Sequence, residues 1–229
     1  HLLMRRPKHA PLTVALNGRR VGRLNRQSSG AVDFTYDAEW LEWEHALAVS
    51  LSLPLREDRY IGAPVLAVFE NLLPDNEVIR RRLAERLGAD GEDAYSLLSV
   101  IGRDCAGALQ FLPEGEAPIV PGAPGGEPLT DAAIGDIIAN LATAPLGLEE
   151  GRDFRISLAG AQEKTALLRK EGQWLRPQGA SPTTHILKPQ IGRTDGGVVL
   201  SQSVENEYLC HKLTRALGAH SADVDVKDS

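Results

Sequence analysis

Apolar and polar residues alternate with a period of two at the beginning of the chain, which is the pattern of half-buried β-strands. Residues 12–16 (LTVAL) and 21–24 (VGRL) predict two strands that are joined by the turn dipeptide Asn17-Gly18, a strong hairpin signal. Residues 31–36 and 47–55 continue the alternation and predict two more strands. We therefore expect a small antiparallel sheet in this part of the chain.

Helical spacing of apolar residues follows. Residues 64–73 begin with Pro64, a residue that suits the first turn of a helix, and residues 77–87 continue to a plausible stop at Gly88. A short apolar stretch at residues 95–100 precedes a predicted strand at 108–112. Further helices are predicted from Thr130 and over residues 201–217, and residues 223–229 are suited to begin a strand.

Residues 113–128 (PEGEAPIVPGAPGGEP) are rich in proline and glycine and have no periodicity, which predicts a linker. This linker divides the chain into an amino-terminal subdomain, residues 1–112, and a second unit, residues 129–229. The fold class that we expect is α+β.

The composition excludes some classes of protein. The chain has 229 residues and a formal net charge of −6, which argues against a generic binder of polyanions. Arg80, Arg81 and Arg82 are therefore interpreted as a solvated helix face. The two cysteines, Cys105 and Cys210, are far apart and predict reduced thiols in a cytosolic protein. No apolar run has the length of a membrane span.

Candidate chemistry is concentrated in residues 155–188. Two apolar runs, ISLAG and KTALL, flank the small turn Ala161-Gln162-Glu163, and a third apolar run ends at Lys188. Two strands with a phosphate-covering turn, followed by a strand that supplies a fixed cation, form a nucleotide-binding arrangement. The pattern has ordinary interpretations as well, namely a simple hairpin, a lysine at a strand end and, at His185, a packed and hydrogen-bonded histidine.

The turn does not fit a Walker-type phosphate loop, because Glu163 and Leu158 occupy positions that need glycine. It also has only Gly160 where a protein-kinase loop has three glycines. Small residues still allow the backbone to approach phosphates, and Lys164 is within reach of a phosphate. A carboxylate on the following helix would hold Lys188 in place, and the candidates are Glu205 and Glu207.

Residues 156–168 (ISLAGAQEKTALL) resemble the signature loop of the HipA family of toxin kinases. Residues 181–189 (SPTTHILKP) resemble the lysine strand of that family, and residues 201–208 (SQSVENEY) resemble its next helix. Residues 69–75 and 98–111 are similar to its amino-terminal subdomain. The resemblance implies an antiparallel-sheet subdomain with helices, followed by a partial protein-kinase-like N-lobe.

The resemblance further implies a serine/threonine kinase toxin of a bacterial type II toxin–antitoxin system that uses ATP and Mg²⁺. It implies ATP-binding residues and, at Ser157, a serine whose autophosphorylation switches the kinase off. Expected partners are a HipB-like helix-turn-helix antitoxin, glutamyl-tRNA synthetase as substrate, and DNA only through the antitoxin. The implied ATP-binding residues are Ala159, Gly160, Ala161, Gln162, Glu163, Lys164 and Lys188.

A kinase also needs a catalytic aspartate and Mg²⁺ ligands, and these would belong to a C-lobe that we expect to be absent. The aspartates after Lys188 lack the required spacing, so we predict no catalytic or metal residue in this chain and no phosphotransfer by it alone. The alternative is a non-catalytic module that binds an antitoxin or a separate kinase chain. The aspartates concerned are Asp195, Asp223, Asp225 and Asp228.

Overall fold

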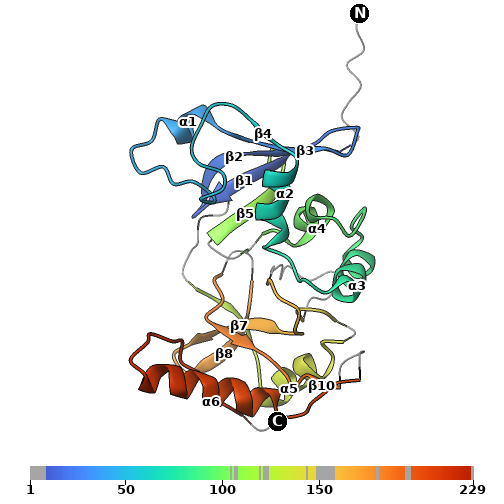
Figure 1. Ribbon diagram of the computed structural model, residues 1–229, viewed down its shortest axis with the longest axis vertical. Coiled ribbons are helices and arrows are strands. Elements are labelled where there is room, and N and C mark those ends of the chain that lie inside the picture. The colour runs from blue at the N-terminus through green and yellow to red at the C-terminus, as the bar shows by residue number, and fades with distance from the viewer. Residues whose placement is uncertain are drawn as a thin grey trace, which may run out of the picture.

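The amino-terminal part of the chain is built on a five-stranded antiparallel sheet, seen in a computed structural model of the protein (Figure 1). The strands are β1 (Leu12–Leu16), β2 (Arg19–Arg26), β3 (Val32–Tyr36), β4 (Tyr60–Ile61) and β5 (Leu109–Pro113), in the spatial order β4-β3-β2-β1-β5. The structure describes residues 9–103, 105, 108–118, 120, 124–142, 144–147, 158–178, 181–193 and 197–227.

The predicted hairpin is confirmed. Asn17 and Gly18 have φ values of 50° and 74°, and such positive φ values at both central residues match the right-handed twist of the strands they join. β1 then pairs with β5, although the two strands are far apart in the sequence, and β5 forms one edge of the sheet.

The described residues of this part form the helices α1 (Ala38–Leu41), α2 (Ala63–Glu70), α3 (Glu77–Leu87) and α4 (Ala94–Ile101). The predicted stop of α3 is confirmed, because Gly88 adopts a left-handed conformation with φ 67°. The core is formed where α2 meets the sheet. Phe69 of α2 packs edge-to-face against Phe34 of β3 and Phe111 of β5, with ring centroids 5.7 and 5.2 Å apart.

The predicted strand over residues 47–55 is wrong. This segment is a loop whose backbone is bonded to side chains: the Tyr36 hydroxyl donates to the Leu53 carbonyl, and the Val49 amide donates to the Tyr36 oxygen at 3.0 Å. Leu47 is 62% and Leu51 100% exposed, so the alternation does not define a buried face. The edge of β3 that such a strand needs is taken by β4.

A second, four-stranded sheet has the order β6-β8-β7-β9, and its strands are β6 (Gly126–Pro128), β7 (Thr165–Lys170), β8 (Gln173–Pro177) and β9 (His185–Leu187). All its pairings are antiparallel. Residues 126–128, which the sequence assigns to the linker, thus form β6 and pair with β8. The division into 1–112, 113–128 and 129–229 stays a prediction.

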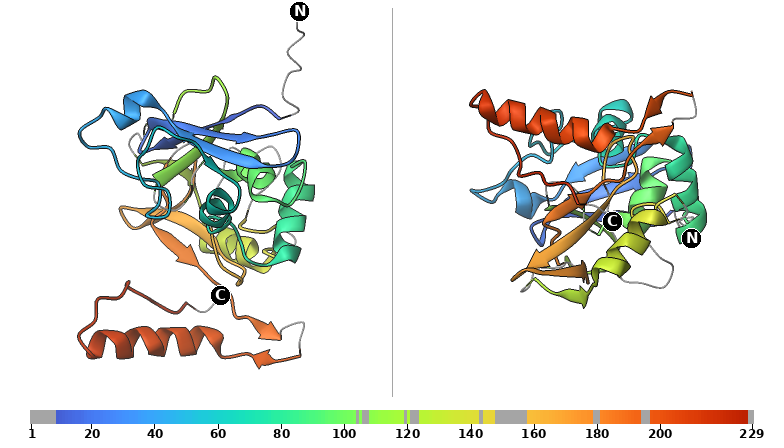
Figure 2. Two further views of the ribbon diagram at one scale, coloured as in Figure 1. Left: turned by 45° about the horizontal axis from the view of Figure 1, so that its top comes forward. Right: turned by 90° about the horizontal axis from the view of Figure 1, so that it is seen from below.

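The remaining elements are α5 (Asp131–Ala139), the short pair β10 (Gly192–Arg193) and β11 (Val199–Leu200), and α6 (Ser203–Ala216). Figures 1 and 2 show α6 along the end of the molecule that lies opposite the five-stranded sheet. No residue of α6 is buried, and Leu209 and Leu213 are each more than half exposed. Residues 223–227 do not form the strand that their sequence suggests.

Both cysteines are free thiols, of which Cys105 is buried and Cys210 is exposed. Along the part of the chain that the structure describes, no helix is both long and apolar enough to cross a membrane.

Candidate nucleotide-binding site

Residues 158–164 form a loop that leads into β7, and this loop is the turn that the sequence singles out. The predicted strand before it is not seen. Ile156 and Ser157 lie outside the described residues, and Leu158 and Ala159 have no strand conformation. A further strand could not pair with β7, because β7 is already paired on both sides, with β8 and with β9. The hairpin of β7 is therefore made with β8.

Lys164 holds the shape of the loop. Its side chain turns back, and its Nζ donates a hydrogen bond to the Ala159 carbonyl at 2.6 Å. Lys164 is only 7% exposed. Gly160, between these two residues in sequence, has φ +103°, and a Cβ there would lie 2.8 Å from the lysine Nζ. The loop thus needs glycine both for its backbone conformation and for its close approach to the cation.

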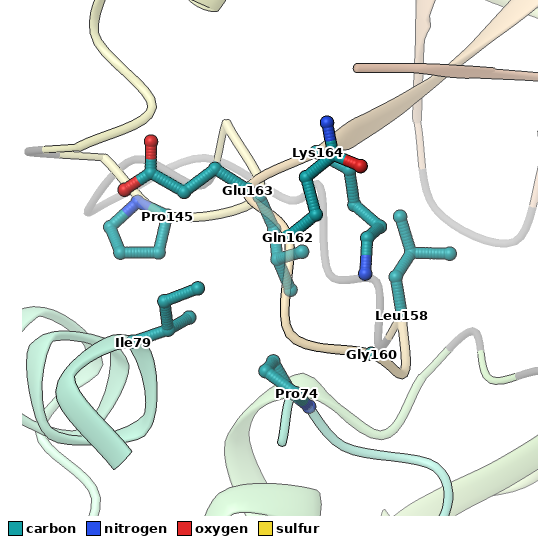
Figure 3. Close-up of a pocket in the computed structure, with 9 residues that line it drawn as sticks. Pro74, Ile79, Pro145, Leu158, Gly160, Gln162, Glu163 and Lys164 are labelled. Carbon is teal, nitrogen blue, oxygen red and sulfur yellow. The ribbon is translucent and has the colours of Figure 1, made fainter. Parts of the chain in front are cut away.

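Figure 3 shows Lys164 reaching toward Gly160 and Leu158 along one side of a small pocket. Pro74 and Ile79 of the amino-terminal part lie on the opposite side of this pocket. Ala159 and Ala161 are exposed on the loop surface. The expectation that Lys164 contacts a phosphate stays a prediction, because its ammonium is directed at the loop backbone in this structure.

Two lysines face each other at this end of the sheet. β7 and β9 pair with Thr165 opposite Leu187 and Ala166 opposite Ile186. Continuing this register by one residue places Lys164 opposite Lys188. Burial lowers the pKa of Lys164, the nearby charge of Lys188 lowers it further, and Asp75 acts in the opposite direction. Like charges directly opposite each other on adjacent strands are destabilising.

The structure distinguishes the two candidate carboxylates. Lys188, one residue beyond β9, donates from Nζ to Glu207 Oε1 of α6 at 2.6 Å. Glu205 instead accepts a 2.6 Å hydrogen bond from Gln190 Nε2, and this bond lowers the pKa of Glu205. Glu207 is therefore the carboxylate that contacts the lysine.

Further contacts hold the loop from both sides. Gln162 Nε2 donates to the Pro189 carbonyl at 2.8 Å, next to Lys188. On the other side, the Asp75 amide donates to the Gly160 carbonyl at 3.3 Å, and Arg82 lies 3.8 Å from Glu163. The sequence does not indicate the contacts of Asp75 and Arg82, because more than eighty residues separate each of them from its loop partner.

Ile186 is another residue that the sequence interpretation did not select, although strand alternation places it on the same face of β9 as Lys188. It is 56% exposed and stands opposite Ala166, which is fully buried. The face of the sheet beside the two lysines therefore carries one exposed apolar side chain. His185 is exposed rather than packed inside, and it lies against Trp174 with a hydrogen-bonding contact to Thr184 of 2.8 Å.

Among the described residues, no group of three or more histidine, cysteine, aspartate or glutamate side chains is placed to hold a metal ion. What the described site offers is a pair of lysines, a loop of small residues and an adjacent exposed apolar side chain.

Comparisons with known proteins match both parts of the chain to one family. The family model described as the HipA N-terminal domain matches residues 12–112, and the model described as the HipA-like C-terminal domain matches residues 156–229.

Relatives with known names point the same way. A Sinorhizobium fredii protein, Y4mE, named as a kinase by inference, is 37% identical over 221 residues, which are 95% of this chain and 51% of the relative. The serine/threonine-protein kinase toxin HipA of Shewanella oneidensis is 29% identical over 156 residues, covering 68% of this chain and 33% of the toxin. The chain thus spans about half the length of Y4mE.

A solved structure of the Shewanella oneidensis toxin–antitoxin complex of HipA, HipB and operator DNA resembles this chain with a TM-score of 0.67 and 24% identity. The match covers 95% of this chain and 47% of the solved chain. It shows that the two share a mixed fold of helices and antiparallel sheets.

Proposed function

The chain belongs to the HipA family, and we propose that it provides the part of a serine/threonine protein kinase that binds ATP phosphates. In this proposal the second sheet and α6 are a partial kinase N-lobe, residues 159–164 are the phosphate loop, and Lys188 is the ATP-contacting lysine. The five-stranded sheet with its helices is the amino-terminal subdomain.

The opposition of Lys164 and Lys188 is the observation that supports this proposal most directly. The strand register places these two residues opposite each other, and burial together with the charge of Lys188 lowers the pKa of Lys164, although Lys188 is also paired with Glu207. An anion between or beside them would favour the charged form of Lys164. The loop that covers Lys164 has small residues, so its backbone can come close to a phosphate group.

Two other features are consistent with a nucleotide. The exposed side chain of Ile186 offers an apolar contact on the lysine side of the sheet, which suits a nucleotide base. The pairing of a strand lysine with a helix carboxylate, seen here for Lys188 and Glu207, is the arrangement by which protein kinases position the lysine on ATP phosphates.

We propose that phosphotransfer from ATP to a protein serine belongs to a longer protein and that these 229 residues alone do not catalyse it. Support comes from the relatives, which are about twice as long. Mg²⁺, when bound, would neutralise charge on the phosphates, and we assign none of its ligands to the described residues. Glutamyl-tRNA synthetase is proposed as the substrate and the cytoplasm as the location, on the resemblance alone.

Regulation by autophosphorylation is proposed for Ser157, which precedes the loop. A dianionic phosphate there would repel ATP phosphates. A HipB-type antitoxin is the proposed partner, because the structural neighbour is a HipA–HipB–DNA complex. DNA would then be contacted only through the antitoxin.

The test is a direct measurement of ATP binding by the 229-residue chain, using calorimetry or a fluorescent ATP analogue. Lys188→Ala should weaken binding about tenfold or more, as expected for loss of a charge-assisted hydrogen bond. Lys170→Ala is the matched control, because Lys170 is an exposed lysine at the other end of β7. A folded chain without measurable ATP affinity would favour the non-catalytic binding module instead.

A further inference from the structure

We propose that the amino-terminal domain sets the position of the phosphate loop, with Asp75 and Arg82 as positioning residues that act on the loop without touching nucleotide. This proposal deepens the nucleotide-site assignment and rests on it only for its consequence on ATP affinity. The contacts join two parts of the chain that separate family models match, residues 12–112 and residues 156–229.

The first contact is made by the backbone. The Asp75 amide, at the beginning of the segment that leads into α3, donates to the Gly160 carbonyl at 3.3 Å. Gly160 is the residue whose φ of +103° shapes the loop. A donor from the amino-terminal domain therefore bonds to the loop at the residue on which its conformation depends.

The second contact is ionic. Arg82 of α3 lies 3.8 Å from Glu163, with the two side chains about 42% and 35% exposed. A partly exposed pair of this kind contributes little stability by itself, but it defines which side of α3 faces the loop. Arg81, the preceding residue, is exposed. The interpretation of the three arginines as one solvated face is therefore wrong for Arg80, whose side chain is 17% exposed and paired with Glu70.

The third contact is apolar. Leu158, at the start of the described loop, packs against a hydrophobic core that joins residues of the amino-terminal part with Leu146 and Ala166 of the second part. Pro74 and Ile79 of the amino-terminal part line the same pocket as Leu158 and Lys164 (Figure 3). Packing, the hydrogen bond and the ion pair thus contact the beginning, the middle and the far end of the loop.

The residues that contact the loop are themselves held firmly. Arg80 Nε donates to the Pro74 carbonyl at 2.6 Å, and its guanidinium pairs with Glu70 of α2. Glu70 in turn accepts from the Ala94 amide at the start of α4, at 3.2 Å. The segment before α3 is therefore joined to both neighbouring helices. Because its position is fixed by this network, the loop is placed by the amino-terminal domain rather than by its own sheet alone.

Charge adds to this arrangement. Asp75 is an acidic group that favours the charged form of Lys164, against the effects of burial and of Lys188. The amino-terminal domain therefore supplies both a donor for the loop backbone and a countercharge for the loop lysine.

The experiment is site-resolved hydrogen exchange of the 229-residue chain without nucleotide, following the Asp75 amide and the amides of residues 159–164. Arg82→Glu and Glu163→Arg should each accelerate exchange at these amides, by up to about fivefold for a partly exposed pair. The double charge reversal should restore most of the protection against exchange, and Arg82→Lys should retain most of it. Arg81→Glu is the matched control on the same helix and should leave exchange at the loop unchanged.

Equal exchange in the wild type and both single charge reversals would overturn the proposal, as would a double reversal that exchanges as fast as the singles. ATP affinity, measured on the same variants, tests the other assignment separately. If exchange responds and no variant binds ATP, the positioning role stands and the nucleotide-site proposal fails. If ATP binds and exchange does not respond, the positioning role fails.

Discussion

Lys188 Nζ contacts Glu207 Oε1 at 2.6 Å, and this contact joins the end of β9 to α6. It is supported by Gln190, whose amide group bonds to Glu205 Oε2, to Ser203 Oγ and to the Val204 amide. Because α6 has no buried residue, the polar contacts at its amino-terminal half decide where it lies. The position of the lysine and that of the helix are therefore linked.

Glu207→Gln should weaken ATP binding several-fold, because Lys188 then loses the charge that holds its ammonium in place. Glu205→Gln is the matched control, since Glu205 contacts Gln190 and not the lysine. Both variants are measured by calorimetric titration with ATP. An equal loss of affinity in the two variants would contradict the assignment of Glu207.

Gly160→Ala should destabilise the loop by about 1–3 kcal/mol through backbone strain, with an added clash against Lys164 Nζ, which would lie 2.8 Å from the new Cβ. Gly172→Ala isolates the strain. Gly172 also has a positive φ, of +83°, but it has no atom within 4 Å of an added Cβ. We expect a lower melting temperature for both variants and a loss of ATP affinity for Gly160→Ala alone. Unchanged ATP affinity in Gly160→Ala would count against a role of the loop in binding.

Stability should depend on pH through Lys164. Its pKa in the folded state lies below its ordinary value of 10.5, mainly because of burial, so the unfolded chain binds more protons than the folded chain between these two values. The Lys164 contribution to the free energy of unfolding therefore rises with pH across that window. Tyr36 and Tyr95 have raised pKa values and act in the opposite direction at alkaline pH.

The measurement is urea unfolding of the wild type and Lys164→Met at several pH values between neutral and alkaline. The free-energy difference between the two proteins should shift in favour of the wild type as pH rises, which cancels the tyrosine contributions. A difference that stays constant with pH would show that Lys164 is not electrostatically strained.

Truncation to alanine should reduce stability much more at a core position than at an exposed position. Phe69→Ala removes a ring that is 1% exposed and contacts two other aromatic rings, so we expect a loss of about 3–5 kcal/mol. Leu213→Ala on the exposed face of α6 should change stability by less than about 0.5 kcal/mol. Chemical denaturation measures both. A large loss in Leu213→Ala would show that its side chain is covered in solution, for example by self-association.

Local sequence signals predicted much of the fold. The Asn17-Gly18 turn, the proline at the start of α2 and the glycine after α3 each act within a few residues, and the structure has all three features where the sequence places them. The strand predicted at residues 47–55 failed for a reason that is not local. Tyr36 and Trp40 supply hydrogen-bond partners to that segment, and β4 already occupies the sheet edge.

The sequence alone determined the family, the loop of small residues at 159–164 and the two candidate lysines, because these are carried by residue types in a fixed local order. Only the tertiary structure decided that Glu207 rather than Glu205 contacts Lys188, and that Asp75 and Arg82 contact the loop. Glu205 and Glu207 lie on one helix, and their partners depend on how that helix is rotated against β9. Asp75 and Arg82 are brought to the loop by the packing of two parts that are distant in sequence, and no local pattern records that packing.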